Sequence, residues 1–185
     1  MDQNNKETDV QVYASPEDFI ELRQWWMKGL YNGFEKMTPE EACKILFQTA
    51  KSCAINFGRV LEKKYGRMTD LDSLIERLDK DAKTADGYTI REGNVVRQLF
   101  KPKGKCICPL VQKGFIELHP YHSLCSIGSM IYSFEFFTKQ PIVAELVEAP
   151  CWGHQDEILN YYLYAPKREV IWPDGRRIDV SEIKI

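Results

Sequence analysis

The sequence predicts an α+β fold, in which N-terminal helices pack on an antiparallel sheet of about four strands, with one helix between two hairpins. Helical periodicity with capping signals fills residues 15–85, whereas alternating patterns and turn residues fill most of residues 86–185. Helices and strands that are segregated in this way are typical of α+β proteins rather than of alternating α/β proteins. We therefore expect a flexible tail over 1–14 and one domain over 15–185, with a helical part followed by a sheet and cysteine-bearing part.

Three helices are expected in the first half of the chain. Thr38 can cap a helix through its hydroxyl, and Glu41 stands three residues later, which completes a capping box. The long helix that follows is expected to end near residue 66, where two lysines precede a glycine. The three expected helix starts are Ser15, Thr38 and Thr69.

The second half reads as two hairpins and two longer strands around one helix. A Glu-Gly-Asn turn at 92–94 separates two short runs rich in β-branched residues, which predicts a hairpin. A broad apolar face predicts a helix that is ended by Gln140-Pro141. The expected elements are strands at 88–90 and 95–100, a helix at 126–138, strands at 142–147 and 157–164, and a last hairpin over 170–180.

The composition limits which binding partners and which cellular compartment are expected for the chain. The chain has 25 basic and 27 acidic residues, so it lacks the basic footprint of a nucleic-acid-binding protein. No apolar run approaches the ~20 residues of a membrane-spanning helix, and the N-terminus has no secretion-signal pattern. We therefore expect a cytoplasmic protein, with no nucleic-acid or membrane partner and with six cysteines that are mostly reduced.

The cysteines divide into two groups. Cys43 and Cys53 belong to the long helix and are interpreted as core residues, because free cysteine behaves as a small hydrophobe. Cys106 and Cys108 follow a strand and a Pro-Lys-Gly break, and such a loop lets two thiolates converge on one metal ion. Cys125 is expected at the start of a helix, where the helix dipole lowers the pKa of a thiol.

Histidines and acids lie close to these cysteines in the sequence. His119 and His122 precede Cys125, and His122 stands three residues before it. Cys151 and His154 share the loop between the last two long strands, so both can face one point. Three interpretations stay open for this second group: packing without chemistry, a bound metal ion, and a catalytic thiol. The acids Glu145 and Glu148 on the preceding strand add candidate oxygen ligands.

Aromatic residues of the first helix are weaker candidates. Trp25, Trp26 and Tyr31 are interpreted as core or as a dimer face, because aromatic side chains dominate both environments, and lining of a ligand pocket is the alternative.

The second half resembles a known family. It contains Cys106-Ile107-Cys108-Pro109-Leu110-Val111, then Cys125-Ser126-Ile127-Gly128, then a helix, then Pro141-Ile142-Val143-Ala144-Glu145-Leu146-Val147-Glu148 and a glycine turn. This layout over 88–165 resembles the 4-vinyl reductase-like domain superfamily, which is similar in fold to transport-particle subunits of vesicle tethering. The L-2-amino-thiazoline-4-carboxylate hydrolase-like group has a similar layout.

The resemblance implies helices on a four-stranded antiparallel sheet, a buried pocket for a small or lipid-like ligand, and in many members a dimer. In the sensing members it also implies a structural zinc, for which Cys125, Glu145 or Glu148, and Cys151 match by position. The chain departs from that pattern because no further cysteine follows Gly153, where His154 is the substitute.

Three functions are thus expected from the sequence. The first is a stand-alone small-molecule or metal-binding domain with a cysteine-lined site, which forms a homodimer if it follows the family. The second is a thiolate-dependent hydrolase for a small cyclic amide-like or thiazoline-like substrate, and the third is a protein-interaction domain without chemistry. The expected zinc ligands are Cys106, Cys108, Cys125, Glu148, Cys151 and His154, and the expected catalytic residues are Cys125 or Cys108 as nucleophile with His122 as base.

Overall fold

A computed structural model describes residues 16–34, 36–103, 106, 108–112, 114 and 118–183. The tail expected over 1–14 lies outside these residues. The helices are α1 (Pro16–Phe34), α2 (Pro39–Tyr65), α3 (Leu71–Lys83), the one-turn α4 (Pro109–Gln112) and α5 (His122–Thr138), with a 3-10 turn η1 (Pro150–Trp152). The strands are β1 (Tyr88–Glu92), β2 (Val95–Phe100), β3 (Val143–Glu148), β4 (Glu157–Tyr162), β5 (Glu169–Ile171) and β6 (Arg177–Asp179).

The helix starts agree with the sequence for α1, which begins at Pro16, and for α2, and they differ for α3 and α5. The capping box at the start of α2 is confirmed, because the Thr38 hydroxyl accepts from the backbone of Glu41 and the Glu41 carboxylate accepts from the backbone of Thr38. Helix α3 is capped by Asp70 rather than by Thr69, because Ser73 stands three residues after Asp70 and returns the hydrogen bond. Helix α5 begins at residue 122 instead of 126.

The expected α+β class is confirmed, and the sheet is larger than expected. Within the described part of the chain it has six strands in the order β1-β2-β4-β3-β5-β6. The additional strands β5 and β6 form the expected C-terminal hairpin, which joins the sheet because β5 pairs with β3. This is a parallel pair, whereas the other neighbours are antiparallel.

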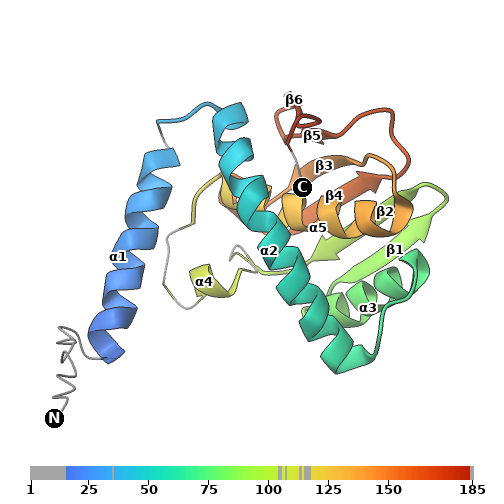
Figure 1. Cartoon of the computed structure of the whole chain (residues 1–185), viewed down its shortest axis with the longest axis horizontal. Helices are drawn as coiled ribbons and strands as arrows, with labels where there is room; N and C mark the ends of the chain where they lie inside the picture. The colour runs from blue at the N-terminus through green and yellow to red at the C-terminus, as the bar shows by residue number, and fades with distance from the viewer. Residues whose placement is uncertain are drawn as a thin grey trace, which may run out of the picture.

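Helices α5 and α2 form two layers on one face of the sheet. In Figure 1, α5 lies along the sheet and the long α2 crosses over it on the outer side. The two helices approach closely at Gly128, where an added Cβ would lie 2.8 Å from the Cβ of Ala50 and 3.1 Å from the ring of Phe47. Helix α3 packs on β1 beside them. The core between these layers includes Phe47, Leu61, Ile131, Phe134, Leu146, Leu159 and Tyr161.

Helix α1 stands apart from the other helices and is held mainly at its C-terminal end (Figure 1). Tyr31 and Phe34 in its last turns are buried. Trp25 and Trp26 are 64% and 68% exposed, so in this chain alone they do not belong to the core. Within the described residues, no helix has both the length and the apolar character needed to cross a membrane.

Candidate functional site

Four cysteines lie in the neighbourhood of the buried Tyr31. They come from α2, from the loop before α4 and from α5, and each is close enough to raise the pKa of the Tyr31 hydroxyl by its negative charge. Burial of the ring raises this pKa further and is the larger cause. Because Tyr31 belongs to the last turns of α1, four segments far apart in sequence meet at one place. The four cysteines, hereafter the thiol cluster, are Cys53, Cys106, Cys108 and Cys125.

Cys53 and Cys125 are neighbours within the thiol cluster. The neighbouring Cys125 thiol lowers the pKa of Cys53. Cys53 in turn raises the pKa of Cys125, and burial of Cys125 adds to the increase. Cys53 is exposed, whereas Cys125 is half-buried. Of the two thiols, Cys53 is therefore the one whose pKa is lowered.

This arrangement corrects two expectations about the cysteines. Cys53 was expected in the core, but it lies at the edge of the α2 stripe, and the core expectation is confirmed for Cys43, which is fully buried. Cys125 was expected at the start of a helix, but α5 begins at His122, so Cys125 is its fourth residue. The pKa of Cys125 is raised rather than lowered, because the neighbouring Cys53 and burial both act on it.

A second group lies beside the thiol cluster and contains a buried acid. Cys106 is close to both Cys151 and Glu157, whose negative charges raise its pKa, although burial is the larger cause. The Cys151 thiol lies 3.7 Å from the carbonyl oxygen of Pro120. Glu157 is 3% exposed, and burial raises the pKa of its carboxyl to about 7.

His122 is buried against the thiol cluster as a neutral ring. It stacks on Tyr31 with ring centroids 4.2 Å apart, and burial lowers its pKa to about 4. Its Nδ1 lies 2.8 Å from the backbone nitrogen of His119, and its Nε2 has no hydrogen-bond partner among the described residues. An imidazole held in this way is a weak general base, because its proton affinity is low and one nitrogen is already in use.

The expected metal ligands are only partly brought together. Cys106, Cys108 and Cys125 belong to the thiol cluster, and Cys151 borders it. The Nδ1 atom of His154 lies 3.2 Å from the backbone of Ala149 within its own loop. Among the residues that the structure describes, no three His, Cys, Asp or Glu side chains are grouped as metal ligands. The zinc site stays a prediction.

The two acids of β3 were candidate oxygen ligands. Glu145 instead accepts hydrogen bonds from Asn160 at 2.9 Å and from the Tyr162 hydroxyl at 2.6 Å, both on the neighbouring strand β4. Glu148, at the end of β3, is half-buried.

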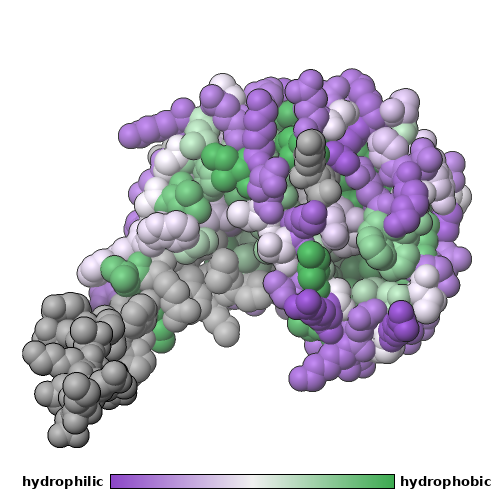
Figure 2. Space-filling model, in the orientation of Figure 1, coloured by the Kyte–Doolittle hydropathy of each residue, from purple (hydrophilic) through white to green (hydrophobic). Residues whose placement is uncertain are grey.

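A cleft opens further along the same two helices. It has a volume of about 570 Å³ and lies between α2, α3 and α5. Its walls are mostly apolar, and Figure 2 shows apolar atoms gathered on the right of the molecule, over the region where these helices meet. Arg59, Glu62 and Arg67 also line it. Neither arginine has an ion-pair partner among the described residues, and the Glu62 carboxylate accepts a hydrogen bond from the backbone of Met68 at 3.1 Å. The apolar lining includes Ala54, Phe57, Leu61, Met68, Leu74, Leu78, Met130 and Phe137.

Sequence reasoning missed two features of this region. Glu157 stands two and four residues before the buried Leu159 and Tyr161, so strand alternation places it on the buried face, and this signal could have found it. The cleft had no sequence signal, because its wall residues are ordinary members of three helical stripes.

No family model and no curated protein matches this chain. Among solved structures, it is similar to a trafficking protein particle complex subunit 3 from Naegleria fowleri, crystallised covalently bound to palmitic acid. The TM-score is 0.50 with 12% sequence identity, and the match covers 82% of this chain and 98% of the other. At this identity the likeness concerns the fold alone.

Proposed function

We propose that this chain is a small-molecule-binding domain, whose ligand occupies the cleft between α2, α3 and α5. The observation that carries the proposal is the cleft itself, because about 570 Å³ with mostly apolar walls is typical of pockets for small organic ligands. Arg59 and Arg67, which have no ion-pair partner in the described part of the chain, favour a ligand with an acidic group, since a guanidinium binds a carboxylate with two parallel hydrogen bonds. The ligand class is therefore an apolar carboxylate.

The solved neighbour is consistent with this class but differs in one respect. Its description names covalently bound palmitic acid, which is an apolar acyl chain. The cleft of this chain has Met68 in its wall and no cysteine among its lining residues. We therefore propose non-covalent binding here, with the cysteines serving a separate role.

Calorimetric titration with decanoic acid tests the proposal, with decanol as the uncharged control ligand. We expect saturable binding of the acid, which becomes about tenfold weaker in the Arg59→Gln/Arg67→Gln variant, because one charge-assisted hydrogen bond is worth about 1.5–3 kcal/mol. Gly58→Leu should abolish binding by filling the cleft, since Gly58 lines it on the helical α2. Gly29→Leu on α1 is the matched control, as nothing lies within 4 Å of its Cβ position. Absence of saturable binding by both probes would overturn the proposal.

A thiolate-dependent hydrolase is the second candidate, and the exposed position of Cys53 together with its lowered pKa favours it. In this version Cys53 is the nucleophile in place of Cys125 or Cys108. His122, whose pKa is lowered, forms hydrogen bonds and does not serve as the base. Hydrolysis of a thiazoline carboxylate by the wild type, lost in Cys53→Ser and kept in Cys43→Ser, would support the hydrolase. No turnover by the wild type would exclude that substrate class.

A further inference from the structure

We propose that the mouth of the cleft docks on the surface of an anionic lipid bilayer, from which the cleft takes up its apolar carboxylate. The inference deepens the proposed function and rests on it, because it states where the ligand comes from. It is carried by the charges and the exposed apolar side chains around the opening between α2, α3 and α5. The sequence led us to expect no membrane partner because it has no spanning segment, but docking on a surface needs none.

Exposed cations without ion-pair partners border the cleft. Two of them are the arginines of its wall. The Nζ atom of Lys51 on α2 lies 5.7 Å from the centroid of the Tyr132 ring, which is part of the wall. The Nζ atom of Lys139, just after α5, lies 4.4 Å from the centroid of the Phe136 ring, which is also part of the wall. Among the residues that the structure describes, these four side chains form no ion pair. The rim cations are thus Lys51, Arg59, Arg67 and Lys139.

The rim cations make the opening positive in a chain that is negative overall. Among the described residues that line the cleft, Glu62 is the acid, and its carboxylate accepts a hydrogen bond from the backbone of Met68. Four positive charges thus stand against one negative charge here, whereas the formal net charge of the chain is -2. Grouped basic residues are attracted to anionic headgroups, and each strengthens binding to such a surface about fivefold.

Apolar side chains are exposed at the same opening. Phe136 is 57% exposed and Ile55 is 41% exposed, although both belong to the cleft wall. They therefore lie at the rim of the cleft and not deep inside it. Exposed apolar groups beside cations are typical of surfaces that contact a bilayer, because the apolar groups enter the interface while the cations bind the headgroups.

The chemistry of the ligand favours a bilayer over other occupants of this surface. A carboxylate with a long apolar chain partitions from water into lipid, so the bilayer is where such a ligand is concentrated. A second copy of the chain would present the same rim cations, and repulsion between like charges would oppose that contact. With the rim on the bilayer, the apolar walls of the cleft face lipid instead of water, and the ligand enters without crossing the solvent.

Co-sedimentation of the full chain with vesicles tests the docking, with phosphatidylcholine vesicles compared with vesicles that also contain phosphatidylserine. We expect sedimentation with the anionic vesicles only, and its loss at high salt. Lys51→Gln/Lys139→Gln should weaken this binding on the order of twentyfold, since two basic residues are removed. Lys80→Gln/Lys83→Gln is the matched control on α3, where both lysines already pair with acids, and it should bind as the wild type does.

The Lys51→Gln/Lys139→Gln variant also separates docking from ligand binding. Its affinity for decanoic acid in solution should equal that of the wild type, because neither lysine lines the cleft. Binding of decanoic acid without sedimentation would overturn the docking and leave the proposed function standing. Sedimentation without binding of decanoic acid would support the docking surface and overturn the proposed function.

Two further results would overturn the docking on an anionic bilayer. One is equal sedimentation with neutral and anionic vesicles, because the rim cations would then play no part. The other is binding of polyglutamate without binding of anionic vesicles, which would make an acidic protein the occupant of the rim.

Discussion

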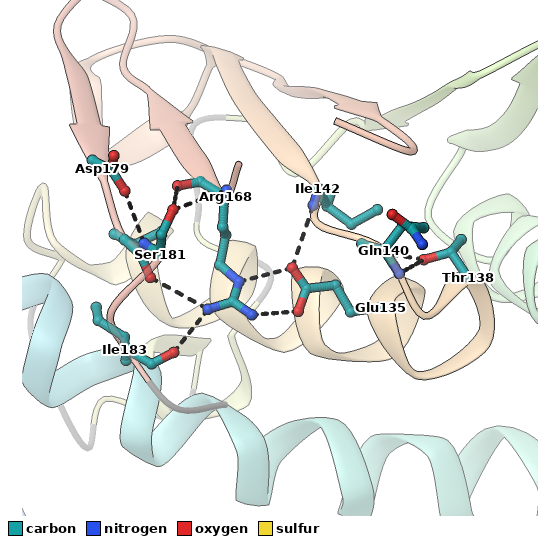
Figure 3. A network of polar contacts seen from close by, with 9 residues as sticks. Glu135, Thr138, Gln140, Ile142, Arg168, Asp179, Ser181 and Ile183 are labelled. Carbon is teal, nitrogen blue, oxygen red and sulfur yellow. Dashed lines mark hydrogen bonds and ion pairs between the residues drawn. The ribbon is translucent and has the colours of Figure 1, made fainter. Parts of the chain in front are cut away.

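Glu135 of α5 and Arg168, just before β5, form a bidentate ion pair that is largely shielded from solvent (Figure 3). The two guanidinium–carboxylate distances are 2.7 Å and 2.5 Å, and the side chains are 15% and 16% exposed. Arg168 also donates to the carbonyl oxygens of Val180 and Ile183, and Glu135 accepts from the backbone of Ile142. One pair thus joins a central helix, the start of β3 and the C-terminal segment.

Arg168→Met should destabilise the fold by about 2–4 kcal/mol, because it leaves the Glu135 carboxylate without its partner in a poorly solvated place. Chemical denaturation measures the change. Lys80→Met is the control, since Lys80 and Glu76 form an exposed pair on α3 that is worth at most about 0.5 kcal/mol. Equal effects of the two variants would contradict the role given to the Glu135–Arg168 pair.

Gly128→Ala should lower the stability by about 1–2 kcal/mol. The added methyl group meets Ala50 at 2.8 Å and forces α2 away from α5, which costs more than the ~1 kcal/mol that alanine gains over glycine in a helix. Gly29→Ala on α1 makes the same chemical change with nothing within 4 Å, so it should be neutral or stabilising. The two midpoints of thermal unfolding should therefore shift in opposite directions, and a stabilising Gly128→Ala would show that the two helices separate easily.

The buried Glu157 should make stability depend on pH. Burial raises its pKa to about 7 from the value of 4.5 that applies in an unfolded chain, so the folded state binds the proton more tightly. The stabilisation from this proton is complete below pH 4.5 and is lost as the pH rises to about 7, by about 3 kcal/mol in total.

Glu157→Gln removes this titration while it keeps the shape of the side chain. Denaturation at several pH values measures the effect. Between pH 4.5 and 7, the free energy of unfolding of the wild type should fall relative to that of the variant. A constant difference over that interval would mean that Glu157 is not buried as described.

Local signals in the sequence were enough to predict the helices and most of the sheet. The Thr38–Glu41 capping box and the 92–94 turn depend on residues within three positions of each other. Both can therefore be identified from the local sequence alone. The pairing of β5 with β3 was not predictable in this way, because short strands far apart in sequence find their partners through tertiary packing.

The candidate site was harder to predict for the same reason. A helical stripe in the sequence shows which residues share a face, but it does not show where the neighbouring helix ends, and Cys53 falls at that edge. Tyr31 was assigned to core, dimer face or pocket, and its position among four thiols depends on where α1 docks. The register of Cys125 on α5 also changed once the helix was found to begin four residues earlier.

The parallel pairing of β3 with β5 has a consequence for how the protein is made. Strand β4 follows β3 closely in the chain and can pair with one edge of it early, but the other edge waits for residues 169–171 to leave the ribosome. Until then the edge of β3, with the buried residues Val143 and Ala144, offers unpaired backbone groups to any neighbouring chain. The most aggregation-prone interval of synthesis should therefore lie between the emergence of β4 and that of β5.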